Sequence, residues 1–243
     1  MRGMSSRLPF GLGNIPDPPD PRDFLWRALV RPEPMKLPRA YRVRTCGPVL
    51  DQGPLPHCVA FATATVKMVD EYRERKVWYG FDEAWLYDLC KQNDGKPNRD
   101  GTNLRTALKL VQKQGYVARG IYQRAKHLPG RKRTFRLKNY VKVESTRQIK
   151  EAVKTVGPVA FGIKVDQGIY RPVDGRVPEP DGKPFGGHAM VISGWDDDLG
   201  AFRIKNSWGY DWGDRGFAWL PYTHFDAYKW NAWKTVDQLG EPV

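Results

Sequence analysis

Cysteine and histidine are scarce in this chain, with three and four copies among 243 residues. A small, odd number of cysteines argues against a disulfide scaffold and agrees with a reducing compartment. Neither residue type shows the spacing of a zinc site, so we expect no metal and no other cofactor. Cys46 and Cys90 are expected to be buried thiols, and the sequence alone does not decide whether they form a disulfide with each other.

Long apolar runs are also missing. No run could cross a bilayer, and the N-terminus lacks the apolar core of roughly 7 to 15 residues that a secretory signal needs. We therefore expect a cytoplasmic protein without a membrane partner. Apolar residues make up 40% and aromatic residues 12%, which excludes disordered and fibrous classes. The length suits one large domain or two packed halves with a cleft between them.

Acidic residues are too few to balance the basic ones, at 27 Asp and Glu against 40 Lys and Arg, which leaves a net charge of +13. Such an excess raises the question of a nucleic acid or an acidic surface as partner. The densest basic stretch is 124–142, and no nucleic-acid motif accompanies it. We interpret this stretch as a solvated connector, expect no nucleic-acid partner, and regard acidic substrates as the better functional alternative.

Four residues in a fixed order carry the main chemical signal. Gln52 and Cys58 lie in DQGPLPHCVAFATA, His188 lies in GGHAMVISGW, and Asn206 lies in IKNSWGYDWGDRG. A cysteine nucleophile needs a base to take its proton, a group that holds the base, and a donor for the oxyanion. A lone cysteine is most often a small core residue, but this combination favours a nucleophile.

Each of the four residues has a predicted role. The Cys58 thiolate would attack an amide carbonyl, and the oxyanion would be held by the Cys58 backbone N–H and the Gln52 side-chain amide. His188 would act as general acid and then as general base, while the Asn206 side-chain oxygen fixes its tautomer. Cys58 is also expected at a helix N-terminus, where the dipole favours a thiolate.

His188 and Asn206 follow Cys58 by 130 (188 − 58) and 148 (206 − 58) residues. This spacing, together with LPRAYRVR, GPVLDQG and NSWGYDWGDRG, resembles the papain-like cysteine peptidases of the papain and cathepsin family, in the prokaryotic type without a long prosegment. The resemblance runs from about Leu37 to the C-terminal strands. It implies an α+β fold with a helical half, a sheet-rich half and the active site between them, and it implies hydrolysis of peptide bonds.

The resemblance also indicates substrate-binding residues. Gly101 and Thr102 match the segment that lies along an extended peptide. Leu104 and Gly162 are weaker candidates for the pocket that reads the second residue before the cut. Trp208 is expected to cover the hydrogen bond between Asn206 and His188.

Four positions near the predicted nucleophile and base depart from the family pattern. Leu55 replaces a cysteine that usually forms a disulfide, and Pro56 replaces a glycine that shapes the pocket. His57 replaces a serine, and we assign it a wall or pKa-modulating role rather than that of the base. Gly187 stands before His188 where the family often has Asp or Asn, and we place Gly187 and His57 among the substrate-binding residues.

The periodicity predicts helices first and strands later, which is α+β order. Thr102 is a plausible cap for the third helix, and Ser145 with Gln148 forms a capping box for the fourth. The predicted helices cover 58–75, 81–92, 102–115 and 145–158, and the strands cover 159–165, 188–195, 201–206, 217–222 and 229–236.

Residues 1–36 are rich in proline and predict an extended N-terminal arm, followed by a catalytic domain at 37–243 with a helical half (37–120) and a sheet-rich half (121–243). We expect the arm to pack across or near the cleft.

Alternatives to a peptidase remain open at this point. One is a cysteine-dependent acyl transferase, and another is a papain-like scaffold that binds a partner without turnover. A third, a basic nucleic-acid-binding module, would bind DNA or RNA in a salt-dependent way that survives Cys58→Ala. The expected partner is a peptide or protein substrate, and the oligomeric state is undetermined.

Overall fold

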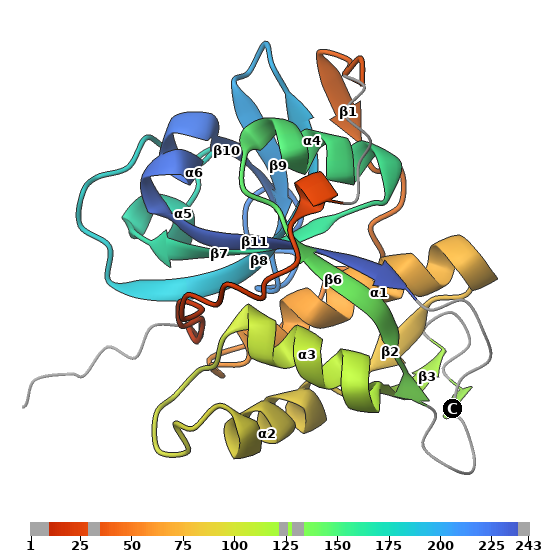
Figure 1. Cartoon of the computed structure of the whole chain (residues 1–243). Coiled ribbons are helices and arrows are strands. Elements are labelled where there is room, and N and C mark those ends of the chain that lie inside the picture. The colour runs from red at the N-terminus through yellow and green to blue at the C-terminus, as the bar shows by residue number, and fades with distance from the viewer. Residues whose placement is uncertain (1–9, 29–34, 122–125, 128–133, 238–243) are drawn as a thin grey trace, which may run out of the picture.

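The computed structural model describes residues 10–28, 35–121, 126–127 and 134–237. Three helices and a small sheet gather on one side of the molecule, and a larger sheet with shorter helices forms the other side (Figure 1). This is the α+β arrangement that the sequence predicts. In the helical group, the helices are α1 (Cys58–Arg75), α2 (Glu83–Asn93) and α3 (Leu104–Gln114).

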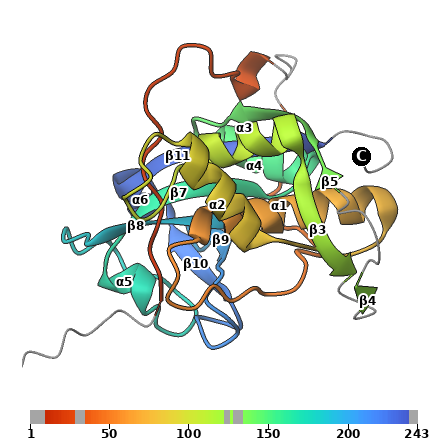
Figure 2. The same ribbon diagram turned by 90° about the horizontal axis from the view of Figure 1, so that it is seen from below.

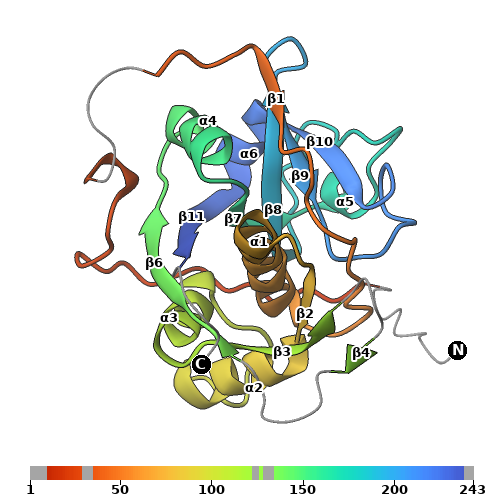
Figure 3. The ribbon, with the colours of Figure 1, turned by 90° about the vertical axis from the view of Figure 1, so that its right-hand side faces the viewer.

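Helix α1 begins where the sequence predicts, because Pro54 and Pro56 prevent a helix before Cys58. Residues Cys58–Ala60 and Ala62–Glu71 of α1 are buried, so the helix is packed on almost all sides. Small residues in this segment, such as Ala and Thr, let neighbouring elements approach it. Viewed along α1 in Figure 3, the helix lies directly in front of the large sheet.

The small sheet is antiparallel and packs against α1 and α2. Its strand order is β2-β3-β4, and β5 also pairs with β3. The strands are β2 (Tyr79–Phe81), β3 (Tyr116–Ile121), β4 (Lys126–His127) and β5 (Thr134–Phe135).

The large sheet is antiparallel, with the order β10-β9-β8-β7-β11-β6, and β1 pairs with β8. Strands β7 and β8 are paired so that Ile163 stands opposite His188. The strands are β1 (Ala40–Arg42), β6 (Leu137–Lys142), β7 (Val159–Val165), β8 (Gly186–Asp196), β9 (Ala201–Lys205), β10 (Phe217–Pro221) and β11 (Lys229–Asp237). The shorter helices are η1 (Trp26–Ala28), α4 (Thr146–Thr155), α5 (Gln167–Tyr170) and α6 (Tyr222–Tyr228).

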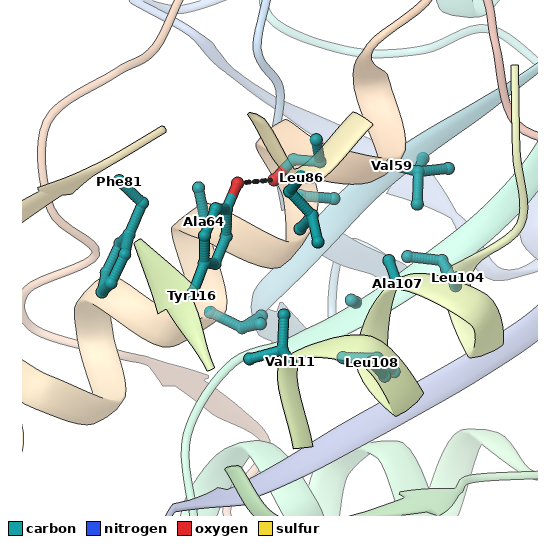
Figure 4. Close-up of a cluster of buried hydrophobic side chains, with 14 of the residues drawn as sticks. Val59, Ala64, Phe81, Leu86, Leu104, Ala107, Leu108, Val111 and Tyr116 are labelled. Atoms are coloured by element: carbon teal, nitrogen blue, oxygen red, sulfur yellow. Dashed lines mark hydrogen bonds between the residues drawn. The ribbon is translucent and has the colours of Figure 1, made fainter. Parts of the chain in front are cut away.

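The buried hydrophobic side chains form two clusters, and the cluster around the helical group also includes residues of the large sheet such as Ala189 and Trp233. Figure 4 shows part of the helical core, where Leu104 and Leu108 of α3 lie with Val59 of α1 and Phe81 of β2. The hydroxyl of Tyr116 donates to the Ala60 carbonyl over 3.0 Å, so the buried phenol is satisfied.

Buried charges join the two groups. The Lys234 ammonium of β11 lies 3.3 Å from the Asp70 carboxylate of α1, and the Thr235 hydroxyl donates to the same carboxylate over 2.6 Å. A buried pair of this kind is costly to break, because the remaining charge is left without a partner. These contacts hold the C-terminal half of α1 against the sheet.

Two local predictions need correction. Asn103, not Thr102, caps α3: the Asn103 side-chain oxygen accepts the Thr106 N–H over 2.9 Å, and the helix begins at Leu104. Thr102 instead pairs with the N-terminal arm. In addition, the short helices α5 and α6 and the strands β1 to β6 were not predicted; of these, β1 lies early in the chain yet pairs with β8 of the large sheet.

The basic stretch 124–142 lies partly outside the described residues, at 124–125 and 128–133. The rest contributes to β4, β5 and β6, and Leu137 and Val141 of β6 are buried, so the prediction of a solvated connector is wrong for this strand. Within the described part of the chain, no helix is long and apolar enough to span a membrane.

Candidate active site

The four predicted catalytic residues come from separate parts of the fold. Cys58 is the first residue of α1, His188 lies on β8, Asn206 follows β9, and Gln52 lies in the loop before α1. Helix α1 packs against β8. The backbone N–H of Ala189, the residue after His188, contacts the Cys58 thiol and lowers its pKa. The fold thus brings the thiol and the imidazole to the same place.

The His188 ring is held from two sides. Its Nε2 lies 2.7 Å from the Asn206 side-chain oxygen, which also accepts the Ser207 backbone N–H over 2.8 Å. The Trp208 ring stacks on the imidazole with 4.3 Å between centroids, and both side chains are buried. The other ring nitrogen, Nδ1, has no hydrogen-bond partner among the described residues. This leaves Nδ1 available for proton transfer.

The Gln52 side chain has a defined orientation. Its carbonyl oxygen accepts the Ser207 hydroxyl over 2.8 Å, so its NH₂ group points the other way. The NH₂ group donates to the Leu55 carbonyl over 2.7 Å and to the Gly11 carbonyl over 3.1 Å. Gly11 belongs to the N-terminal arm, so the donor expected to bind an oxyanion is bound to a peptide carbonyl of the same chain.

Cys58 and His188 each have 0% exposed surface. Burial raises the pKa of the Cys58 thiol to about 12 and lowers the pKa of His188 to about 4. Both groups are therefore neutral at pH 7 in this conformation. For Cys58, the effect of burial on the pKa outweighs the backbone N–H groups of Gly13, Cys58, Val59 and Ala189, which lower it.

The arm lies directly over the predicted nucleophile. Gly13 and Asn14 donate their backbone N–H groups to the Gly187 carbonyl over 3.1 and 3.0 Å. Thr102 N–H donates to the Gly13 carbonyl over 2.9 Å, and Ile15 N–H donates to the Thr102 carbonyl over 2.8 Å. The arm pairs with Thr102 in the parallel sense. Figure 2 shows it as a red trace that runs across β8.

The arm's first described residue packs on the aromatic side chains beside the site. Phe10 stacks on Trp208 with 4.9 Å between ring centroids and 6° between the planes. Its backbone N–H donates to the Tyr170 hydroxyl over 2.8 Å. The arm therefore covers the site from Trp208 to Thr102.

Two glycines allow the arm to approach so closely. A Cβ atom on Gly11 would overlap the Leu55 carbonyl, and a Cβ on Gly13 would overlap the Pro56 carbonyl. The Gly13 N–H also contacts the Cys58 thiol and lowers its pKa. Only glycine fits at these two positions without a shift of backbone.

The segment at Gly101 is fixed by side chains of α2. Its N–H donates to the Tyr87 hydroxyl over 3.0 Å, and its carbonyl accepts the Lys91 ammonium over 2.9 Å. His57 stacks on the Tyr87 ring at 4.0 Å, and burial lowers the pKa of His57. The roles of Gly101 and His57 in substrate binding stay predictions.

The remaining predicted pocket residues lie in different environments. Gly162 faces the side chains of Asn14 and Asn231. A Cβ on Gly187 would meet the Trp230 ring, which fills the space where the family often has a side chain. Leu104 is fully buried in the helical core (Figure 4), and its role as a pocket residue stays a prediction without a supporting contact.

Sequence reasoning missed several residues at the site, namely Ser207, Tyr170, Tyr87 and Asn231. Ser207 lies inside the NSWG segment and could have been found there. The other three have no local signal, because only tertiary packing brings them to the arm or to Gly101.

Cys46, Cys58 and Cys90 are free and buried, so the first and last do not pair. Among the described residues, no three His, Cys, Asp or Glu side chains are grouped as metal ligands.

Comparison with known proteins places this geometry in a family. Residues 37–229 match the model of the papain family cysteine proteases. The chain is 27% identical over 192 residues to Peptidase 1 of Euroglyphus maynei, covering 73% of this chain and 58% of that protein. It is 26% identical over 210 residues to cathepsin L1 of Drosophila melanogaster, covering 78% and 55%. The chain thus spans little more than half of these two relatives.

The fold is also similar to a solved structure of nearly the same extent. Xylellain, a cysteine protease from Xylella fastidiosa, aligns with a TM-score of 0.78 at 23% identity, covering 97% of this chain and 99% of that one. From the match over 37–229, together with the arrangement of Cys58, His188 and Asn206, we conclude that the chain belongs to the papain family of cysteine proteases.

Proposed function

We propose that the chain is a cysteine peptidase in which Cys58 is the nucleophile, His188 the general acid and base, Asn206 the residue that orients His188, and Gln52 an oxyanion donor. The observation that carries this proposal is a peptide already lying at the site. The arm's main chain is bound to Gly187, Thr102 and Gln52, beside the Cys58 thiol.

In the proposed reaction, His188 takes the Cys58 proton and the sulfur attacks the carbonyl carbon of the scissile amide. The Gln52 NH₂ group and the Cys58 backbone N–H donate to the oxyanion. His188 then gives its proton to the leaving amine, which departs with the C–N electron pair. Water, activated by the same imidazole, hydrolyses the thioester and regenerates the thiol.

We propose further that residues 1–36 form an inhibitory arm on a catalytic domain at 37–243. The carbonyl of Gly11 uses a Gln52 donor that an oxyanion would need, and Gly13 lies against the thiol. Substrate can react only after this segment leaves, because both Cys58 and His188 are fully buried while it is docked.

The test is turnover of a mixed library of fluorogenic peptides by the full chain and by its Cys58→Ala variant at pH 5 to 8. Mass spectrometry after treatment with a thiol-directed epoxide locates the reactive cysteine. Turnover that is absent from Cys58→Ala, with the label on Cys58, is expected, and product masses separate hydrolysis from acyl transfer to an added amine. Turnover that persists in Cys58→Ala would refute the assignment.

A further inference from the structure

Asp17 of the arm places its carboxylate among three N–H donors of the protein body. Its Oδ1 accepts the Arg105 backbone N–H over 3.0 Å, at the start of α3. Its Oδ2 accepts the side-chain NH₂ of Asn231 over 2.5 Å and the indole N–H of Trp233 over 2.7 Å, both from β11. We name these three donors the carboxylate niche. Donors from two separate elements converge on one anion here.

The carboxylate niche is continuous with the path of the arm over the catalytic residues. Asn231, which is 7% exposed, borders the space above Gly162 that the Asn14 side chain occupies. The side-chain oxygen of Asn231 has no hydrogen-bond partner among the described residues. The side-chain oxygen and nitrogen of Asn14 have none there either. A side chain that enters above Gly162 therefore reaches Asn231 first and the rest of the niche behind it.

Charge around the niche divides between the arm and the body. The Arg105 guanidinium lies 2.9 Å from the Asp23 carboxylate and 4.0 Å from that of Asp20, and Lys142 also acts on Asp23. The carboxylates that influence Asp17 and Asp23 are all arm residues, whereas the cations Arg105 and Lys142 belong to α3 and β6.

Burial raises the pKa of Asp17, while the Arg105 N–H, the Trp233 N–H and the Arg105 charge oppose this effect. The carboxylate is thus removed from water and depends on its donors. When the arm leaves, it takes its carboxylates with it, and the donors and the guanidinium lose their acceptors. These donors then face water, and an anion that replaces the arm's carboxylate can make charge-assisted hydrogen bonds to them, which are stronger than neutral ones.

We propose that the carboxylate niche is a substrate subsite that binds the acidic side chain of a residue preceding the scissile bond, entering above Gly162. This inference rests on the proposed peptidase function and assigns it a substrate class, peptides with Glu or Asp on that side of the cut. The arm then inhibits partly by presenting the same chemical group as the substrate.

The experiment uses the full chain carrying Gly13→Ala and Asp17→Ala, which loosens the arm and empties the niche. Quenched fluorescent peptides carry Glu, Gln, Leu or Lys in turn at the second, third and fourth positions before the cut. The comparison of Glu with Gln isolates charge, because the two side chains have nearly the same shape. We expect Glu to be favoured over Gln in kcat/KM by about tenfold or more at one position, as for a charge-assisted hydrogen bond.

Adding Asn231→Asp to this chain replaces a donor by a negative charge at almost unchanged volume. We expect the preference for the Glu peptide to disappear and kcat/KM for the Lys peptide to rise. Asn231→Leu provides a second variant that should lose the Glu preference without favouring Lys, and thermal unfolding shows which variants are folded. The preference for Glu should also decrease as salt rises from 0.05 to 0.5 M, roughly in line with shorter screening lengths.

Equal rates for Glu and Gln, or a Glu preference that both Asn231 variants retain, would overturn the subsite while leaving the peptidase assignment intact. No hydrolysis of any peptide, combined with no epoxide label on Cys58, would overturn the proposed function and the subsite with it.

Discussion

Gly13→Ala is the substitution most directly aimed at the arm. A Cβ at this position would overlap the Pro56 carbonyl, and that atom is backbone and cannot rotate away. The arm must therefore shift at Gly13. Such a shift disturbs the Gly13 N–H bond to the Gly187 carbonyl and the Thr102 N–H bond to the Gly13 carbonyl.

The size of the effect follows from these two bonds. A neutral hydrogen bond contributes about 0.5 to 1.5 kcal/mol net, so the loss of both weakens docking of the arm by about 1 to 3 kcal/mol. This corresponds to a rise in the open fraction of about 5- to 150-fold. The catalytic groups themselves are unchanged, so turnover should rise by the same factor while the open state is the minority.

The assay measures two rates in the full chain, hydrolysis of a fluorogenic peptide and labelling of Cys58 by a thiol-directed epoxide. Both should rise together if the arm controls access. Gly95→Ala is the control for a substitution without a clash, because Gly95 has no atom within 4 Å of its would-be Cβ; its positive φ of 69°, which Gly13 does not share, adds backbone strain only there. Its substitution strains a distant turn and should leave both rates unchanged. Unaltered rates in Gly13→Ala, in a folded protein, would refute the inhibitory role of the arm.

Three further predictions concern the site and its support. In the Gly13→Ala background, Gln52→Ala should lower kcat about 100- to 1,000-fold through loss of an oxyanion donor, with peptide KM as the comparison; a kcat within threefold of the parent would exclude that role. Burial holds the pKa of His188 at about 4 against an ordinary 6.5, so the unfolded chain takes up a proton first as pH falls. The free energy of unfolding should therefore drop by up to about 3 kcal/mol between pH 6.5 and 4 in urea titrations, and by less in His188→Gln; an equal drop in both would contradict the buried neutral imidazole. Lys234→Ala should destabilise the fold by about 3 to 5 kcal/mol, because Asp70 is left buried without its cation; the additional variant Asp70→Asn should recover part of this loss in thermal unfolding.

Local sequence patterns were sufficient for helices α1 to α4 and strands β7 to β11, but they missed the strands β1 to β6 and the short helices α5 and α6. The two prolines before Cys58 and the small residues after it predict α1 with its observed bounds, and VAFGIKV predicts β7 residue for residue. The cap of α3 was assigned one residue too early. Thr102 is a reasonable cap by residue type, but its backbone pairs with the arm, and that contact is not local.

The order and spacing of Gln52, Cys58, His188 and Asn206 were enough to predict the family and the roles of these residues. Spacing identifies the family because the motif residues lie close to the ends of elements, such as the start of α1 or the end of β9, whereas the roles of the four residues stay predictions. The family match over 37–229 agrees with this prediction.

Tertiary structure alone decided the state of the site. The pKa shifts of Cys58 and His188 come mainly from burial, and no local pattern encodes desolvation. The donors around Asp17 come from α3 and β11, more than one hundred residues apart in sequence. The sequence by itself determined which chemical groups the protein carries and in which elements they lie. Folding determined that the arm's glycines and carboxylate meet those groups, because close approach and exclusion of water depend on packing between distant segments.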